Sequence, residues 1–270
     1  METDQQIESG MGTARDYRLA YQFMQRAAEI YAACLRQQPD AMGYLHGRGF
    51  TDATIRAFEL GYAPHNDDVI RKALCAAPDA PYKVKLACEV SLVHRTDDAT
   101  YRDFLHDRVT FPIRWPDAKG KFRVVAFGAR TLCEGTKCKY LNSRTNFIYK
   151  KSVTMYGLDR AYADILNTGE VVLVEGYTDC IAAHQNGIGN VVAAAGTAFT
   201  DGCAHVLAMY ARTARVVMDP DKAGVNGGKK AVEALRRAGV DASAVVLPGG
   251  LDPDEFIGKH GADEFRRLLK

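Results

Sequence analysis

The spacing of apolar residues divides the chain into a helical N-terminal stretch, a short region of strands, and a C-terminal stretch where strands and helices alternate. From Asp16 to about Arg36, apolar residues recur every three or four positions, which predicts a long amphipathic helix. Thr51 is a candidate N-cap for a later, shorter helix. The shorter helices are predicted over residues 41–47, 51–58, 68–74 and 82–87.

After Tyr101 the pattern changes to short apolar runs. Residues 109–114 and 122–127 are predicted strands joined by a turn-rich connector, and residues 131–149 are predicted to form extended loops on a small mixed sheet. From residue 171 the predicted strands are 171–174, 191–194, 215–218 and 244–247, and the predicted helices between them are 179–186, 200–211 and 223–238. Apolar strands that alternate with helices are typical of a parallel sheet covered on both faces.

We therefore expect an α/β protein. Its first part is an N-terminal α+β subdomain with a small mixed sheet over residues 1–160, of which about 15–100 are helical. A parallel-sheet α/β domain is expected over residues 161–250, and a short C-terminal helical segment over 251–270.

Composition places the chain among ordinary globular proteins. Of its 270 residues 47% are hydrophobic and 25% are charged, which excludes a disordered or collagen-like chain. No apolar run approaches the roughly 20 residues that span a bilayer. The first residues are acidic, unlike a secretory or mitochondrial leader, so we expect a cytoplasmic protein. The seven cysteines contain no CxxC pair, so free thiols and no zinc are expected.

The net charge of +2 hides an uneven distribution. Residues 108–160 hold 12 basic and 3 acidic side chains, a net of +9, whereas residues 1–107 and 161–270 carry −4 and −3. Aromatic residues are interleaved with these basic ones. Basic groups neutralise phosphates and flat side chains stack on unpaired bases, so the segment predicts a nucleic-acid groove. The alternative is a solvated strand surface over an aromatic core, which Phe111 and Phe127 are expected to join.

Acidic residues follow three of the predicted parallel strands. They are Glu175 and Asp179 after the first strand, Asp219 and Asp221 after the third, and Asp252 and Asp254 after the fourth. The carboxyl ends of parallel strands share one edge of the sheet. Neighbouring carboxylates repel one another unless a cation intervenes, and hard oxygen ligands suit Mg²⁺ or Mn²⁺. Two such ions about 4 Å apart can hold the attacking and leaving oxygens of a phosphoryl transfer. Asp179 or Asp221, taken alone, is more often a helix cap than a ligand.

A glutamate after one strand and Asp-x-Asp after a later one resemble the TOPRIM domain of primases, topoisomerases and related nucleases. The motifs VEGYTD (174–179), AAGTAFT (194–200), MDPDKAG (218–224) and LPGGLDPDEFI (247–257) resemble, in this order, the signatures of bacterial DnaG-type primases. The upstream motifs YLHGRGFTDATIRAFELGYAP (44–64), DRVTFPIR (107–114), VAFGAR (125–130), KYLNS (139–143) and MYGLDRA (155–161) resemble the RNA polymerase domain of that family.

The resemblance implies a DNA-dependent RNA primase core, which makes short RNA primers on single-stranded DNA from NTPs during DNA replication. It implies catalytic roles for Glu175, Asp219 and Asp221. Two or more Mg²⁺ or Mn²⁺ ions would be held by Glu175, Asp179, Asp219, Asp221, Asp252 and Asp254. The template and nucleotide groove would be lined by Arg108, Arg130, Lys139, Tyr140 and Asn142. A replicative helicase and a zinc-binding domain acting in trans are further candidate partners, no membrane partner is expected, and a monomer is expected.

The sequence also departs from the family pattern. Phe104-Leu105-His106 stands where the family usually has Arg-Phe-Arg, and Pro220 stands where a glycine is typical. Since the family's zinc-binding and helicase-binding domains have no counterpart in these 270 residues, we expect either an excised core or a compact stand-alone primase. Two alternatives remain open: a TOPRIM nuclease, which would not need the upstream motifs, and a catalytically silent nucleic-acid-binding module.

Overall fold

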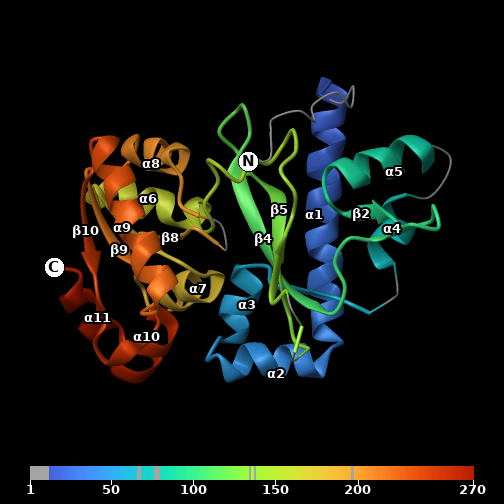
Figure 1. Cartoon of the computed structure of the whole chain (residues 1–270). Coiled ribbons are helices and arrows are strands. Elements are labelled where there is room, and N and C mark those ends of the chain that lie inside the picture. The colour runs from blue at the N-terminus through green and yellow to red at the C-terminus, as the bar shows by residue number, and fades with distance from the viewer. Residues whose placement is uncertain (1–11, 66–67, 76–79, 134, 137, 196–197) are drawn as a thin grey trace.

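A computed structural model describes residues 12–65, 68–75, 80–133, 135–136, 138–195 and 198–270. Two subdomains lie side by side, the N-terminal subdomain on the right of Figure 1 and the parallel-sheet subdomain on the left. The helices of the first are α1 (Ala14–Arg36), α2 (Pro39–Gly47), α3 (Asp52–Ala57), α4 (Val69–Leu74) and α5 (Ala80–Glu89). The described part of the chain holds no helix long and apolar enough to cross a bilayer.

Helix α1 supports the N-terminal subdomain over its whole length. Thr13 and Asp16 form a capping box that satisfies the free N–H groups at its start. Its buried face, which includes Phe23, Ala27 and Tyr31, packs against strands β1 (Gly61–Ala63) and β5 (Phe122–Thr131). The long amphipathic helix predicted from the sequence is therefore confirmed.

The sheet of this subdomain has the strand order β1-β4-β5-β6, with β4 at Arg108–Pro116 and β6 at Tyr140–Asn142. Every pairing within it is antiparallel, so the expectation of a mixed sheet was wrong in this detail. The central strands β4 and β5 are antiparallel because a tight turn joins them into a hairpin. Asp117 fixes this turn by accepting N–H bonds from Lys119 and Lys121. Strands β2 (Val93–Arg95) and β3 (Tyr101–Asp103) form a separate small hairpin.

The second subdomain is built on a parallel sheet with the order β10-β9-β7-β8. Its strands are β7 (Glu170–Val174), β8 (Val191–Ala193), β9 (Thr213–Val217) and β10 (Asp241–Val245). Its helices are α6 (Leu158–Thr168), α7 (Tyr177–Gln185), α8 (Asp201–Ala208), α9 (Lys222–Arg237), α10 (Pro253–His260) and α11 (Ala262–Leu268), with a short 3₁₀ turn at Pro248–Gly250. The predicted α/β class, parallel sheet and C-terminal helices are confirmed. The expected boundary at residue 160 falls inside α6.

A shared core joins the two subdomains where α7 packs against the antiparallel sheet. The rings of Phe111 and Tyr177 stack at 4.9 Å, and both side chains are buried. Gly128 in β5 lets the Tyr177 ring approach the strand, since a Cβ atom there would lie 2.2 Å from that ring. The Tyr177 hydroxyl donates to Asn142 Oδ1 at 2.8 Å, and Asn142 Nδ2 donates to the carbonyl of Ala195 at 3.0 Å. These contacts fix how the two sheets face each other.

Candidate active site

Acidic residues follow three adjacent strands of the parallel sheet, at their carboxyl ends. Glu175 comes directly after β7, Asp219 follows β9, and Asp252 follows the turn after β10. Because these strands are neighbours and parallel, the three side chains reach one edge of the sheet. Burial, and then the charges of Glu175 and Asp252, raise the pKa of Asp219 to about 6. The predicted gathering of carboxylates at this edge is therefore present.

Asp219 has the properties of a cation ligand. Its Oδ1 atom is buried and has no hydrogen-bond partner among the described residues. A buried carboxylate oxygen among like charges is unfavourable unless a cation is bound beside it. Within the described ranges, no three His, Cys, Asp or Glu side chains form a ready-made ligand set. Mg²⁺ usually completes its shell with water and substrate phosphate, so an open acidic edge of this kind fits such an ion.

Asp221 and Asp252 are helix caps that each keep a second oxygen. Asp221 Oδ1 accepts the Gly224 N–H at 2.7 Å at the start of α9, and Asp252 Oδ1 accepts the Glu255 N–H at 2.7 Å at the start of α10. Cap and ligand roles are compatible here, since each cap uses one oxygen of its carboxylate. Gly224 also allows α9 to begin close to Asp219, because a Cβ atom at this position would lie 2.4 Å from the Asp219 carbonyl oxygen.

Asp179 and Asp254 are engaged within the protein. Asp179 is buried and accepts backbone N–H bonds from Gly176 at 2.9 Å and from Asp254 at 3.2 Å. Burial, then the charges of Asp252 and Asp219, raise its pKa to about 8. The Asp254 carboxylate is bound by the guanidinium of Arg48. Asp179 and Asp254 thus hold the loops of the edge together. The sequence analysis predicted both of them as metal ligands.

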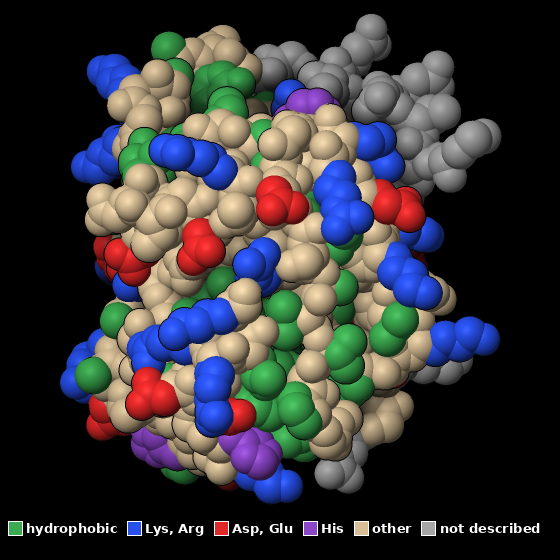
Figure 2. Space-filling view, turned by 90° about the vertical axis from the view of Figure 1, so that its left-hand side faces the viewer, with side chains coloured by type: hydrophobic (Ala, Val, Ile, Leu, Met, Phe, Trp, Pro, Cys, Tyr) green, Lys and Arg blue, Asp and Glu red, His purple; other side chains and the backbone are tan. Residues whose placement is uncertain are grey.

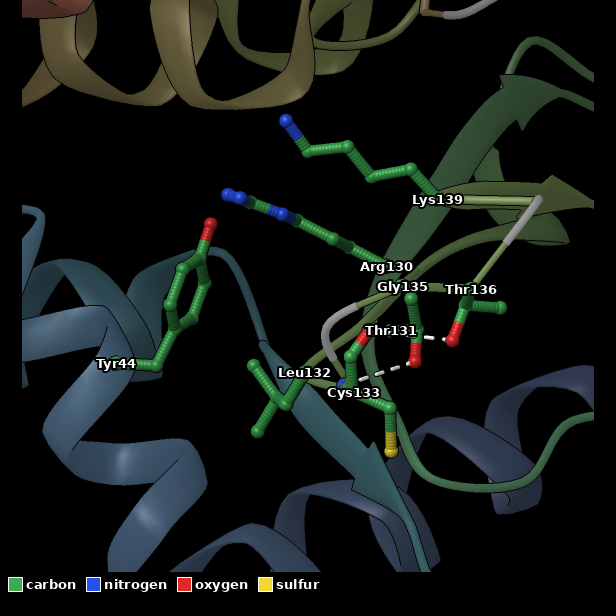
Figure 3. A pocket seen from close by; sticks show the side chains of 8 residues that line it. All are labelled: Tyr44, Arg130, Thr131, Leu132, Cys133, Gly135, Thr136 and Lys139. Carbon is green, nitrogen blue, oxygen red and sulfur yellow. Dashed lines mark hydrogen bonds between the residues drawn. The ribbon is translucent and has the colours of Figure 1, made fainter.

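A basic pocket of about 400 Å³ lies beside the acidic edge. Arg130, at the end of β5, and Lys139 extend side by side into the open space that the Tyr44 hydroxyl also faces (Figure 3). The Arg130 guanidinium is 4.6 Å from the centroid of the Tyr44 ring and 5.8 Å from that of Tyr140. Its Nε atom is buried and has no partner in the described part of the chain. Among the described residues neither Arg130 nor Lys139 pairs with a carboxylate, so the pocket offers two cationic groups to a ligand.

Tyr140 connects the pocket to the acidic edge. Burial raises the pKa of its phenol, Arg130 and Arg48 oppose that rise, and Asp179 and Asp219 add to it. The pKa of the phenol therefore responds to the charges of both the basic pocket and the acidic edge, which are neighbours of Tyr140. The outer face of the parallel-sheet subdomain, in contrast, carries basic and acidic side chains interspersed (Figure 2).

The remaining predicted groove residues have structural contacts. Arg108 donates to the carbonyl groups of Lys139 and Cys138 at 3.2 and 3.1 Å, so it holds the loop that presents Lys139. Both polar groups of Asn142 are used at the subdomain interface. The structure brings Arg130 and Lys139 into one pocket, places the Tyr140 ring 5.8 Å from the Arg130 guanidinium outside the pocket lining, and engages Arg108 and Asn142 in supporting contacts.

Sequence reasoning missed Arg48 and Tyr44. Arg48, directly after α2, donates to Asp254 and, at 3.2 Å, to the Thr178 hydroxyl, so it links the first subdomain to α7 and α10. Both residues lie within the motif at 44–64, which carried the resemblance without indicating a role for either side chain. Their positions depend on packing between segments far apart in the chain, Arg48 against Asp254 and Tyr44 against Arg130, which local patterns do not report.

Comparison with known proteins decides the family. Residues 30–162 match the family described as DNA primase catalytic core, N-terminal domain, and residues 172–257 match the Toprim-like family. A crystal structure of a DNA primase domain from Pseudomonas aeruginosa shares 34% identity with a TM-score of 0.83, over 93% of this chain and 78% of that one. The chain belongs to the DnaG-type primase family.

Other DnaG-type primases support the same assignment. The DNA primase of Clostridium acetobutylicum is 38% identical over 94% of this chain and 41% of its own length. A structure of the DnaG primase catalytic domain bound to ssDNA shares 31% identity with a TM-score of 0.82, over 95% of this chain and 82% of that one. The chain thus spans less than half the length of its curated primase relatives and corresponds to their catalytic core with its Toprim domain. The family predicted from the motifs is confirmed.

Proposed function

We propose that the chain synthesises short RNA primers on single-stranded DNA by transfer of nucleotides from NTPs. The observation that carries this proposal is the pairing of two unlike surfaces in one cleft, the acidic edge around Asp219 and the basic pocket around Arg130. A template-directed polymerase needs positive charge to bind the strand and negative charge to collect the cations that bind triphosphate. The names of the relatives, DNA primase, agree with it.

Divalent cation use is general for Toprim domains and primase cores, and here Glu175, Asp219, Asp221 and Asp252 would hold the ions. When bound, Mg²⁺ or Mn²⁺ would neutralise the triphosphate and favour release of pyrophosphate. Asp179 and Asp254 keep the loops of the edge in place through the contacts described above. We therefore assign Asp179 and Asp254 the role of orienting the loops that carry the other carboxylates.

The chain's own side chains bind and align the nucleic acid. Arg130 and Lys139 would contact phosphates of the template or of the incoming nucleotide, and Tyr140 and Tyr44 offer flat faces beside them. Arg108 and Asn142 keep these groups at a constant distance from Asp219, by supporting the Lys139 loop and the subdomain interface. Positioning and charge neutralisation account for most of the catalysis in phosphoryl transfer, so no nucleophilic side chain is needed. A helicase, a zinc-binding domain in trans and a monomeric state remain predictions.

The test is primer synthesis on single-stranded DNA with labelled NTPs and either Mg²⁺ or Mn²⁺. The wild-type chain is expected to make short RNA, and Asp219→Asn is expected to make none. Glu233→Gln is the matched control, because Glu233 is exposed on α9 away from the strand ends. Breakdown of DNA without RNA synthesis would establish a nuclease instead. Salt-sensitive DNA binding with no turnover, unchanged in Asp219→Asn, would establish a silent binding module.

A further inference from the structure

The guanidinium group of Arg144 is held over an aromatic ring shortly after β6. Its Cζ atom is 5.5 Å from the centroid of the Phe104 ring, which is a cation–π distance. The Arg144 backbone N–H donates to Ser91 Oγ at 3.0 Å, and Ser91 is buried. The backbone and the head group of Arg144 are therefore both positioned before any ligand binds.

The outer side of this guanidinium is accessible. Arg144 is exposed, while Phe104 beneath it is partly buried against the core of the N-terminal subdomain. In the part of the chain that the structure describes, Arg144 forms no ion pair with a carboxylate. The His94 ring meets Phe104 edge-on at 6.4 Å and lies 6.0 Å from the His106 ring, so two further aromatic side chains support Phe104 from the side. The result is an exposed cation that contacts the Phe104 ring and forms no ion pair with any described carboxylate.

Arg144 belongs to the same chain segment as the basic pocket. Arg144 is five positions after Lys139, so the two backbones are at most about 16 Å apart at roughly 3.3 Å per extended residue. Between them Ser143 is buried, and its Oγ accepts the Phe127 N–H at 3.0 Å, so the segment is anchored to β5. A strand bound in the pocket would reach Arg144 within about five stacked nucleotides, at about 3.4 Å for each.

We propose that Arg144, backed by Phe104, is a second contact for single-stranded nucleic acid. The outer face of the guanidinium stacks on an unpaired base, and its N–H groups bind the adjacent phosphate. The inference rests on the proposed function and extends its binding surface beyond the pocket.

The geometry favours a nucleic acid over an acidic protein segment. An acidic peptide needs only positive charge, which a lysine would supply as well. The Arg144 guanidinium lies 5.5 Å from the Phe104 ring, and a planar guanidinium can stack on a nucleobase whereas an ammonium group cannot. Either a DNA template or an RNA strand offers this base and phosphate, so the experiment compares both.

The test measures affinity for labelled oligo-dT and oligo-rU of about 4 and about 16 nucleotides, the range covered by single-strand sites. For the longer strand, Arg144→Ala is expected to weaken binding about tenfold and to reduce the slope of log Kd against log salt by about 0.7. Phe104→Leu is expected to weaken binding without changing this slope. Arg144→Lys is expected to keep the slope and recover only part of the affinity. The shorter strand, bound in the pocket, is expected to be unaffected.

Arg237→Ala is the matched control, because it removes an exposed arginine from the far end of α9, where Arg237 pairs with Asp201. Equal affinities of Arg144→Ala and Arg237→Ala would overturn the proposal, and so would full recovery in Arg144→Lys. If the wild-type chain binds neither strand, the proposed function fails as well. If the wild-type chain makes primers and Arg144→Ala binds like the control, only the stacking contact is refuted. Of oligo-dT and oligo-rU, the one whose affinity falls more in Arg144→Ala is the one whose base stacks on Arg144.

Discussion

Replacement of Gly128 by alanine should disrupt the contact between the two subdomains. A Cβ atom at this position would lie 2.2 Å from both Cζ and Oη of Tyr177 and 2.6 Å from Cε2, so the buried ring must move. Overpacking of a core side chain costs about 1–3 kcal/mol. Loss of the bond from the Tyr177 hydroxyl to Asn142 adds about 1 kcal/mol. Gly128→Ala is therefore expected to lower the free energy of unfolding by about 2–4 kcal/mol.

Urea denaturation followed by fluorescence and circular dichroism measures this loss. Gly227→Ala is the control, because a Cβ atom at Gly227, within α9, meets no atom within 4 Å and should stabilise the helix by up to about 1 kcal/mol. The variant with both Gly128→Ala and Tyr177→Leu should lose less than the two single losses combined, since the smaller side chain leaves room for the methyl group. Strictly additive losses, or a loss below about 0.5 kcal/mol in Gly128→Ala, would refute the steric argument.

Other substitutions test the charges of the site and of the interface. Arg48→Ala leaves the Asp254 carboxylate, which is 9% exposed, without its cation, and is expected to destabilise the protein by about 2–3 kcal/mol in urea, with Arg48→Lys intermediate. In differential scanning fluorimetry without divalent ions, Asp219→Asn should melt at a higher temperature than wild type, because the substitution removes a buried charge among like charges. Mg²⁺ should raise the melting temperature of wild type more than that of Asp219→Asn. A larger rise in Asp219→Asn than in wild type would contradict a cation site. Burial lowers the pKa of His184, whose Nε2 lies 2.8 Å from the Val191 carbonyl oxygen. The unfolded chain then takes up the proton first, so stability is lost as the pH falls below about 6.5, and a His184→Gln variant should show a flatter profile in denaturation between about pH 7.5 and 5.5.

Elements with a strong local pattern were predictable from the sequence, and elements formed by tertiary pairing were not. The strands β7 and β8 are buried on both faces over nearly their whole length and appear as apolar runs. The strands β1 and β6 are three residues long and exist because they pair with β4 and β5. Helix α6 was not predicted, although the sequence carries a signal for it. Leu158, Ala161 and Ile165 lie at helical spacing on one buried face, and a glycine of positive φ stands at each end of the helix.

In the candidate site, too, features set by local sequence were predictable and features set by tertiary contacts were not. The acidic residues were predictable because parallel strands must bring their carboxyl ends to one edge. That Asp179 and Asp254 are engaged within the protein was not predictable, since the Asp254 N–H that binds Asp179 and the Arg48 guanidinium that binds Asp254 come from distant segments. The basic segment was also wider than the pocket. Arg123 pairs with Asp117 at the turn of the β4–β5 hairpin, at the opposite end of β5 from Arg130, so the net charge of the segment does not form one groove.

The opposite charges of the acidic edge and the basic pocket suggest a further role for the interface between the subdomains, which we propose keeps the two surfaces apart. The carboxylates and the pocket cations attract each other, and a direct collapse of one onto the other would neutralise both. The interface opposes this collapse through two contacts. Arg48 forms an ion pair with Asp254, and the hydrogen bond between Tyr177 and Asn142 holds the two subdomains at a fixed spacing. Arg130 and Asp219 each keep a buried polar atom with no partner in the described structure. A substitution that loosens this interface should therefore weaken strand binding and cation binding together, because it allows the two surfaces to pair with each other.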